Sequence, residues 1–367
     1  LFCEHLRDVF QDPKKFPRGR DKIINVLFIR RDINGLKKLV EFSGILIQRI
    51  NDNDGGKTSI MAEGSRMYPD TVDKRFIRWI ELSIQEIKDI GDVVQSILVH
   101  KEKLFVLVNN SHLLKIYQIS DDGLELPGIS VSTEGSGPRE MVVENNKLYF
   151  TNYYTQDVRV LNLSTYYIED SISLDGLPES IVSDGANLWV AINMNSDYSS
   201  ASSVVKINIE SGKVTKAYEV GKGPQQLLID ENQLWISRTY YSPDFTETYY
   251  GTSKIDMKSE AVSILDYGKG TVCGGDVFQF NNQAFRTYNG GAAPLNADLS
   301  LQSLSKIGSY NSNHLYSANG FDEKLFLGIT SDYTAPDTVY VHNSLGEVEE
   351  ELIVGASPGD YAIYKIK

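Results

Sequence analysis

A short sequence phrase recurs about every forty residues along this chain, and this repetition limits the possible folds more than any other feature. Each copy has a basic or amide residue, an apolar residue, an aromatic residue and then further apolar positions, as in Lys147-Leu148-Tyr149-Phe150. The copies begin at Lys103, Lys147, Asn187, Gln233, Gln283 and Lys324. Their starts differ by 44, 40, 46, 50 and 41 residues. This period is typical of a four-stranded β-propeller blade, whereas helical repeats recur every ~33 or ~34 residues.

A proline turn sets the register of the repeat. Pro138, Pro178 and Pro224 each lie ten residues before the leucine of the next phrase. Proline is tolerated at the first residue of a strand, where its missing N–H is not needed by the ladder. Each repeat is therefore expected to contain an inner strand, an aromatic-rich second strand, a third strand and an outer strand. Third strands are expected at 157–161, 203–207 and 338–341.

The two ends of the chain are expected to complete the ring. Six repeats span about residues 94–357, and residues 360–364 read as an inner strand with nothing after it. Strands upstream of the repeats are expected at 58–62, 75–80 and 84–87. Together these segments predict a seventh blade, and closure removes exposed sheet edges. The predicted fold is all-β, a seven-bladed β-propeller over residues 58–367.

The first 57 residues form a separate predicted segment with a different charge. Residues 1–60 carry a balance of +4, whereas the remainder of the chain carries −17. We expect residues 1–57 to be a poorly ordered or non-native basic extension; a small helical pre-domain and a targeting signal are the alternatives.

Composition excludes several function classes. The net charge of −13 argues against nucleic-acid binding, because phosphate neutralisation by basic residues supplies most of that affinity. No stretch approaches the roughly 20 apolar residues of a membrane-spanning helix. The hydrophobic content of 41% is ordinary for a folded domain and argues against disorder.

The repeat resembles the YVTN-type β-propeller repeat of surface-layer-associated and quinoprotein-like propellers. The resemblance rests on a proline turn before a Leu-aromatic-apolar strand that ends in asparagine, as in Leu148-Tyr149-Phe150-Thr151-Asn152. It covers residues 58–367. The resemblance implies an exported protein that is periplasmic, secreted or on the cell surface. It also implies a binding or scaffold role, since enzymes are occasional among such propellers.

Polar residues at the starts of the inner strands are expected to ring the central channel on one face. They are Gln95, Arg139, Glu140, Glu179, Gln225, Gln226, Asp276, Tyr316 and Asp360. A ring of this kind is either a solvated rim or a ligand site, and the sequence leaves both interpretations open.

Tyrosine-rich loops are expected on the same face. The longest insertion contains Arg238, Tyr240 and Tyr241 and continues to Tyr249 and Tyr250. The corresponding loops of other repeats hold Tyr153, Tyr154, Tyr198, Tyr288 and Tyr333. Tyrosine combines a rigid apolar ring with a polar tip, which suits glycan or protein recognition. The predicted ligand-binding residues are Arg139, Glu140, Glu179, Gln225, Arg238, Tyr240, Tyr241 and Tyr316.

Signals for catalysis are few. His314 is the candidate general acid or base if the protein is an enzyme, and its alternative role is a structural hydrogen bond. Ca²⁺ or Mg²⁺ prefers several oxygen ligands, which Glu140, Glu179, Asp276 and Asp360 offer. Cys273 is a lone thiol, and Cys3 is too remote in sequence to presume a disulfide.

The sequence favours a non-catalytic recognition module outside the cytoplasm. It is expected to bind a glycan, a peptide or a partner protein on the tyrosine-rich channel face, with no cofactor. The alternatives are a divalent-cation-dependent hydrolase or lyase and a purely structural ring. The sequence does not indicate an oligomeric state.

Overall fold

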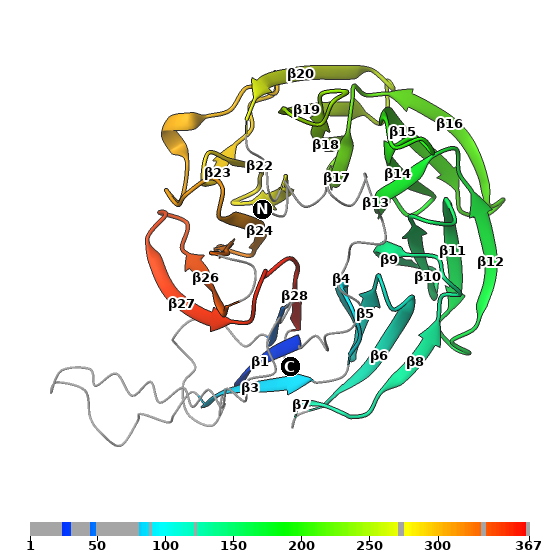
Figure 1. Cartoon of the computed structure of the whole chain (residues 1–367), viewed down its shortest axis with the longest axis vertical. Coiled ribbons are helices and arrows are strands. Elements are labelled where there is room, and N and C mark those ends of the chain that lie inside the picture. Colours follow the sequence, from blue (N-terminus) through cyan, green and yellow to red (C-terminus); the bar gives the residue numbers. More distant parts are fainter. Residues whose placement is uncertain are drawn as a thin grey trace, which may run out of the picture.

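The computed structural model describes residues 24–30, 45–48, 81–87, 90–120, 123–270, 275–331 and 335–364. In these ranges the chain forms β-strands and one short 3₁₀ helix, η1 (Ser303–Ser305). The sheets are arranged around a central opening, as in a β-propeller (Figure 1). Within the same ranges, no helix has the length and apolar character needed to cross a membrane. The predicted all-β propeller fold is confirmed.

Six blades are built from the chain between residues 94 and 354, and each runs from an inner strand outward. The first blade contains β4 (Val94–His100), β5 (Lys103–Val108), β6 (Leu113–Ser120), β7 (Gly123–Leu124) and β8 (Ile129–Ser132). The second contains β9 (Pro138–Glu144), β10 (Lys147–Asn152), β11 (Asp157–Asn162) and β12 (Ile168–Ser173). The third contains β13 (Leu177–Ser183), β14 (Asn187–Met194), β15 (Ser200–Asn208) and β16 (Lys213–Glu219).

The other three blades follow the same antiparallel order. The fourth contains β17 (Pro224–Asp230), β18 (Gln233–Tyr241), β19 (Thr248–Asp256) and β20 (Val262–Lys269). The fifth has three strands, β21 (Val277–Phe280), β22 (Gln283–Tyr288) and β23 (Gly291–Pro294). The sixth contains β24 (Leu315–Phe321), β25 (Lys324–Ile329), β26 (Asp337–His342) and β27 (Val348–Val354). Every copy of the repeated phrase begins a second strand, and the three expected third strands lie in β11, β15 and β26.

A composite sheet occupies the sector between the sixth and the first blade (Figure 1). It combines β1 (Ile24–Arg30), β2 (Ile45–Gln48), β3 (Glu81–Ile87) and β28 (Tyr361–Tyr364), in the order β28-β2-β1-β3. The C-terminal inner strand was therefore predicted correctly. The structure shows six blades of contiguous chain rather than the predicted seven. The remaining sheet combines N-terminal strands with the C-terminal strand, as predicted, but in part from other N-terminal segments.

The strands that join β28 are also not all those expected. β1 and β2 lie within the segment predicted to be an extension, and β28 pairs directly with β2. The expected strand at 84–87 is the second half of β3, whereas 58–62 and 75–80 lie outside the described residues. Short strands far apart in sequence meet here because β28 offers an edge that needs a hydrogen-bonding partner.

The core lies between the blades. Successive side chains of a strand point to opposite faces, so the leucine and the aromatic residue of one phrase face different neighbours. Phe105 packs with Leu148 of the second blade, and Tyr149 packs with Leu188 of the third. Trp189 packs with Leu234 in the same way. The repeated phrase thus specifies the contact between adjacent blades. Burial of each such side chain contributes about 1.5–3 kcal/mol to the stability of the fold.

The turns before the inner strands require glycine at defined positions. Gly223, directly before β17, has a φ of +65°, and a Cβ there would overlap the carbonyl group of Thr239. The N–H of Thr239 donates to the carbonyl oxygen of Gly223 at 2.8 Å, so the turn and the following hairpin are in close contact. Gly185 has a φ of +90° but has open space around it.

We predict that Gly223→Ala lowers the free energy of unfolding by about 3 kcal/mol, because it adds a steric overlap to an unfavourable φ. Gly185→Ala is the control and is expected to cost about 1 kcal/mol, since only the φ is unfavourable. Urea unfolding of both variants measures the difference. Equal losses would show that the contact with Thr239 does not constrain the turn.

Candidate functional site

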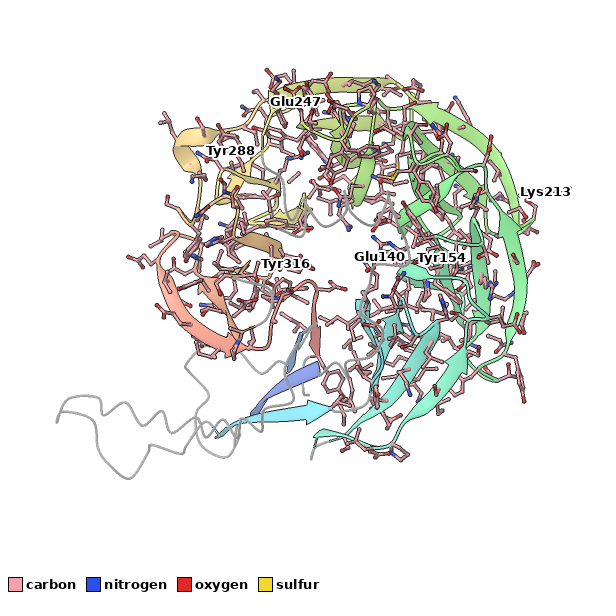
Figure 2. The ribbon with its side chains drawn as sticks, in the orientation of Figure 1. Glu140, Tyr154, Lys213, Glu247, Tyr288 and Tyr316 are labelled. Atoms are coloured by element: carbon pink, nitrogen blue, oxygen red, sulfur yellow. The ribbon has the colours of Figure 1, made fainter. Side chains whose placement is uncertain are left out.

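The starts of the inner strands and the hairpins between second and third strands meet on one face. The N–H groups of Asn109, Tyr153 and Thr287 donate to carbonyl groups at or just before an inner strand, at 2.7–3.1 Å. The predicted channel residues lie at these starts, and Figure 2 shows Glu140 and Tyr316 at the border of the central opening, on different sides. This face is the candidate site, and we call it the channel face.

Arg139 on β9 joins three blades. Its Nε lies 3.0–3.1 Å from both carboxylate oxygens of Glu179 on β13, and its Nη2 also donates to that carboxylate. Its Nη1 donates to Oε1 of Gln95 on β4 at 3.0 Å. Glu179 is 7% exposed, so the pair is largely shielded from water. Arginine matches a carboxylate with two parallel hydrogen bonds, and this geometry fixes both side chains.

Glu140 is the next residue on β9, and it contacts the first blade. Oγ of Ser96 donates to its Oε1 at 2.7 Å. Burial, together with the nearby Asp360 carboxylate, raises the pKa of Glu140 from 4.5 to about 8, against the opposing hydrogen bond from Ser96. Asp360 lies directly before β28 and accepts the N–H of Ile97 at 2.8 Å. Two carboxylates from different sectors of the ring therefore meet beside β4.

Asp276 is a third carboxyl group on the channel face. Its Oδ2 accepts the N–H of Ala318 on β24 at 2.7 Å, which joins the fifth blade to the sixth. Burial raises the pKa of Asp276 to about 7, and Asp360 acts in the same direction. Asp276 therefore keeps its proton up to a higher pH than an ordinary aspartate does.

Tyrosines of two hairpins cluster beside Arg139. The Arg139 guanidinium lies over the ring of Tyr153 at 5.5 Å, and the Tyr153 hydroxyl contacts the sulfur of Met194 at 3.3 Å. Tyr154 follows in the β10–β11 hairpin and is 54% exposed, whereas Tyr198 in the β14–β15 hairpin is 40% exposed. These tyrosines were predicted to lie on this face, and in the structure they lie near the Arg139–Glu179 pair. We call Arg139, Tyr153, Tyr154, Glu179 and Tyr198 the tyrosine cluster.

His112 supports the tyrosine cluster from the first blade. Its Nδ1 accepts the N–H of Gly137 at 3.1 Å, and its ring lies edge-on to Tyr154 with 5.9 Å between centroids. Burial lowers the pKa of His112, which favours the neutral imidazole that can accept this hydrogen bond. No residue spacing in the sequence indicates this role for His112.

The long β18–β19 hairpin differs from its prediction. Arg238 was expected to face a ligand, but it is buried and donates to the carbonyl of Leu265 at 3.0 Å and to Asp266 at 2.5 Å. The ring of Tyr240 stacks on Tyr249 with 5.5 Å between centroids, and Tyr241 lies 5.9 Å from Phe245. The tyrosines of this hairpin are half-buried, and each packs against another aromatic ring.

Arg286 is a buried cation that was not among the predicted site residues. It is fully buried on β22 between the rings of Tyr250 and Tyr267, at 5.5 and 5.6 Å. Its Nη1 donates to Oγ1 of Thr252 at 3.0 Å, and burial lowers its pKa to about 10. A signal was present, because the same position of the phrase is apolar in the other five copies: Val106, Phe150, Val190, Ile236 and Leu327.

The remaining predicted residues have less defined roles. The backbone of His314 accepts the N–H of Thr330 at 2.8 Å, and its ring is half-buried beside the start of β24. Gln225 and Tyr316 are half-buried on inner strands β17 and β24. Cys3, Cys273 and Tyr333 lie outside the described residues.

The four carboxyl groups proposed for a cation do not form one cluster. Across the described ranges, no three His, Cys, Asp or Glu side chains converge closely enough to hold a metal ion. Glu179 is engaged by Arg139, whereas Asp276 and Glu140 serve different seams between blades. The Ca²⁺ or Mg²⁺ site stays a prediction.

We predict that Glu179→Gln lowers the free energy of unfolding by about 2 kcal/mol, because it leaves the Arg139 guanidinium largely buried without its counter-charge. Glu169→Gln is the matched control, since Glu169 forms an exposed pair with Lys147 at 3.5 Å. That variant is expected to cost less than about 0.5 kcal/mol. Urea unfolding measures both, and equal losses would contradict a shielded ion pair at the channel face.

Comparisons with known proteins agree on the fold. The chain is similar to a functionally unknown protein from Desulfotomaculum acetoxidans, with a TM-score of 0.55, 11% identity and coverage of 92% of this chain and 98% of that one. A protein from Lactobacillus plantarum gives a TM-score of 0.55 at 12% identity, covering 93% and 99%. Kuenenia stuttgartiensis hydrazine synthase gives 0.58 at 12% identity, covering 74% and 95%.

Similarity at this level of identity supports the fold alone. No family model matches the chain, so membership of the YVTN-type family stays a prediction. No curated protein matches it either. Taken together, the structure and these neighbours support a β-propeller.

Proposed function

We propose that the protein is a non-catalytic recognition module that binds a partner polypeptide on its channel face. The observation that carries this proposal is the tyrosine cluster. Tyr154 and Tyr198 expose large parts of their rings beside the Arg139–Glu179 pair. Tyrosine and arginine are enriched among the residues that dominate binding energies, because they offer large rigid surfaces with polar ends.

The partner segment is proposed to carry lysine or arginine. The chain has a net charge of −13, so its surface as a whole is acidic. An acidic surface attracts cationic partners and repels anionic ones. Exposed tyrosine rings add to this preference, since a cation over an aromatic face gains about 0.5–1 kcal/mol at an exposed site.

Two further proposals concern the composite sheet and the location of the protein. We propose that the composite sheet acts as a seventh blade, because β28 packs beside β4 and its residues join the cores on both sides. Ala362 packs with the first blade, whereas Tyr361 packs with Phe326 of the sixth. An extracytoplasmic location is proposed from the resemblance to exported propellers.

A binding screen tests the recognition role. Arrays of lysine- and arginine-rich, neutral and acidic peptides, together with a glycan array, are probed with the full chain. We expect binding to the basic peptides that weakens as salt rises. The double variant Tyr154→Ala/Tyr198→Ala is expected to lose at least tenfold in affinity, or about 1.4 kcal/mol.

Tyr167→Ala is the matched control for this experiment. Tyr167 is 74% exposed in the turn between β11 and β12, at the opposite end of the blade from the channel face. We expect this variant to bind as the unmodified protein does. A preference for glycans or acidic peptides, or an equal loss with Tyr167→Ala, would contradict the proposal.

A further inference from the structure

The linker between the first and second blades is held in place by a histidine. This linker, residues 133–137, lies between β8 and β9 and is hydrogen-bonded to the β5–β6 hairpin, which carries His112. The N–H of Thr133 donates to the His112 carbonyl oxygen at 2.7 Å, and the N–H of Gly137 donates to Nδ1 of the His112 ring at 3.1 Å. One residue therefore holds both ends of the linker, once through its backbone and once through its ring.

The same linker holds the β10–β11 hairpin of the tyrosine cluster. The carbonyl oxygens of Gly137 and Ser136 accept the N–H groups of Tyr153 and Tyr154, both at 2.9 Å. A Cβ at Gly137 would lie 2.6 Å from the ring of Tyr154, so the linker backbone and this ring are in direct contact. Two residues after Gly137, β9 carries Arg139. A displacement of the linker therefore moves both tyrosines and Arg139.

The ring of His112 can hold the linker only while Nδ1 carries no proton. Nδ1 accepts the N–H of Gly137 with its lone pair, and in an imidazolium a proton occupies that lone pair. After protonation, the Nδ1–H group and the N–H of Gly137 are two donors that face each other. Gly137 is buried, and a buried N–H without an acceptor costs free energy.

The charged groups around His112 do not reverse this effect. Besides Tyr154, whose ring lies edge-on to the imidazole, the titratable and charged residues of the surrounding elements are Asp92, Glu134, Arg139, Asp157 and Arg159. Arg159 pairs with Asp157, and Arg139 pairs with Glu179. Such charges can change the pH at which His112 gains its proton, but none of them lets an imidazolium accept a hydrogen bond at Nδ1.

We propose that His112 is an acid-sensitive latch that regulates the tyrosine cluster. With a neutral ring, His112 holds the linker and the cluster in the arrangement seen in the structure. When the ring takes a proton from solvent, Gly137 loses its acceptor, and the linker moves away from the β5–β6 hairpin together with Tyr154. The effect on partner binding rests on the proposed recognition function, whereas the movement of the linker does not.

The direction of the pH effect follows from the two states of the latch. In the open latch His112 is hydrated and its pKa has the ordinary value of 6.5, whereas burial lowers the pKa of His112 in the closed latch. The open state therefore binds a proton at pH values at which the closed state does not. Opening is favoured as the pH falls below about 6.5, and the closed latch is retained above that value.

Hydrogen–deuterium exchange of the full chain without a partner, corrected for the intrinsic pH dependence of exchange, tests the latch. From about pH 7.5 to about pH 5.5, we expect protection of the N–H groups of Gly137, Tyr153 and Tyr154 to fall at least about threefold. Protection of β14, in the third blade, is the internal reference and is expected to stay constant.

His112→Asn removes the titration but keeps an acceptor. The amide oxygen of asparagine accepts hydrogen bonds and takes no proton in this pH range, and asparagine tolerates the φ of +53° at this position. We expect protection in this variant to be independent of pH. His100→Asn is the matched control, because His100 is also half-buried with a lowered pKa but lies at the end of β4 away from the channel face. It is expected to behave as the unmodified protein does.

Nitrogen NMR of the His112 ring in the unmodified protein gives a second measurement that needs no variant. The latch requires Nδ1 to be unprotonated at about pH 7.5 and to gain its proton with a midpoint below 6.5. A proton on Nδ1 at neutral pH, or a midpoint above 6.5, overturns the latch. So do pH-independent protection of Gly137 in the unmodified protein and the same loss in His112→Asn. A parallel loss in β14 also overturns it, since that result would mean global unfolding.

Binding of a lysine- and arginine-rich peptide tests the regulation separately. We expect the affinity to fall at least about threefold over the pH range in which His112 gains its proton, and to stay constant over that range in His112→Asn. Absence of peptide binding at every pH would contradict the recognition role, while the exchange and NMR results would still decide the latch. A loss of protection with unchanged affinity would overturn the regulation of binding.

Discussion

Each blade is held in place by an aromatic side chain of its second strand that packs against the second strand of the next blade. Phe105, Tyr149 and Trp189 make this contact in succession, whereas Phe326 packs instead against Tyr361 of the inner strand β28. Because alternate residues of a strand face opposite sides, the adjacent leucine packs against the blade before. A two-residue pattern therefore joins each blade to both neighbours, and the ring depends on its unbroken repetition.

The composite sheet shows what happens where the repetition ends. β28 has the inner-strand position but no chain after it in the described residues, and its edge is filled by β2, β1 and β3. Polar contacts supplement the apolar ones at this seam, since Asp360 holds Ile97 while Ala362 packs with the first blade. Closure thus combines hydrogen bonds with apolar burial.

The side chains of the channel face are of two kinds: some are buried and hold the blades together, and others are exposed. Arg238 and Arg286 are buried cations whose Nη groups donate to backbone carbonyl groups, to the Thr252 hydroxyl and to Asp266. Tyr154 and Tyr198 are instead 54% and 40% exposed. Arg139 belongs to both kinds, because it forms an ion pair with Glu179 and also lies over the ring of Tyr153. A rigid scaffold with exposed aromatic side chains is well suited to recognition.

The sequence by itself determined the propeller architecture, the second strands and the face on which inner strands begin, because these follow from local alternation and a fixed period. It also placed Arg139, Glu140, Glu179 and the tyrosines on that face. The tertiary structure decided which of them meet. Glu140 and Asp360 are far apart in the chain, and β1 and β2 have no repeat signal. Arg238 was expected in an exposed loop but lies buried on β18. Their neighbours are set by the curvature and closure of the ring, which bring distant segments together and which no local pattern encodes.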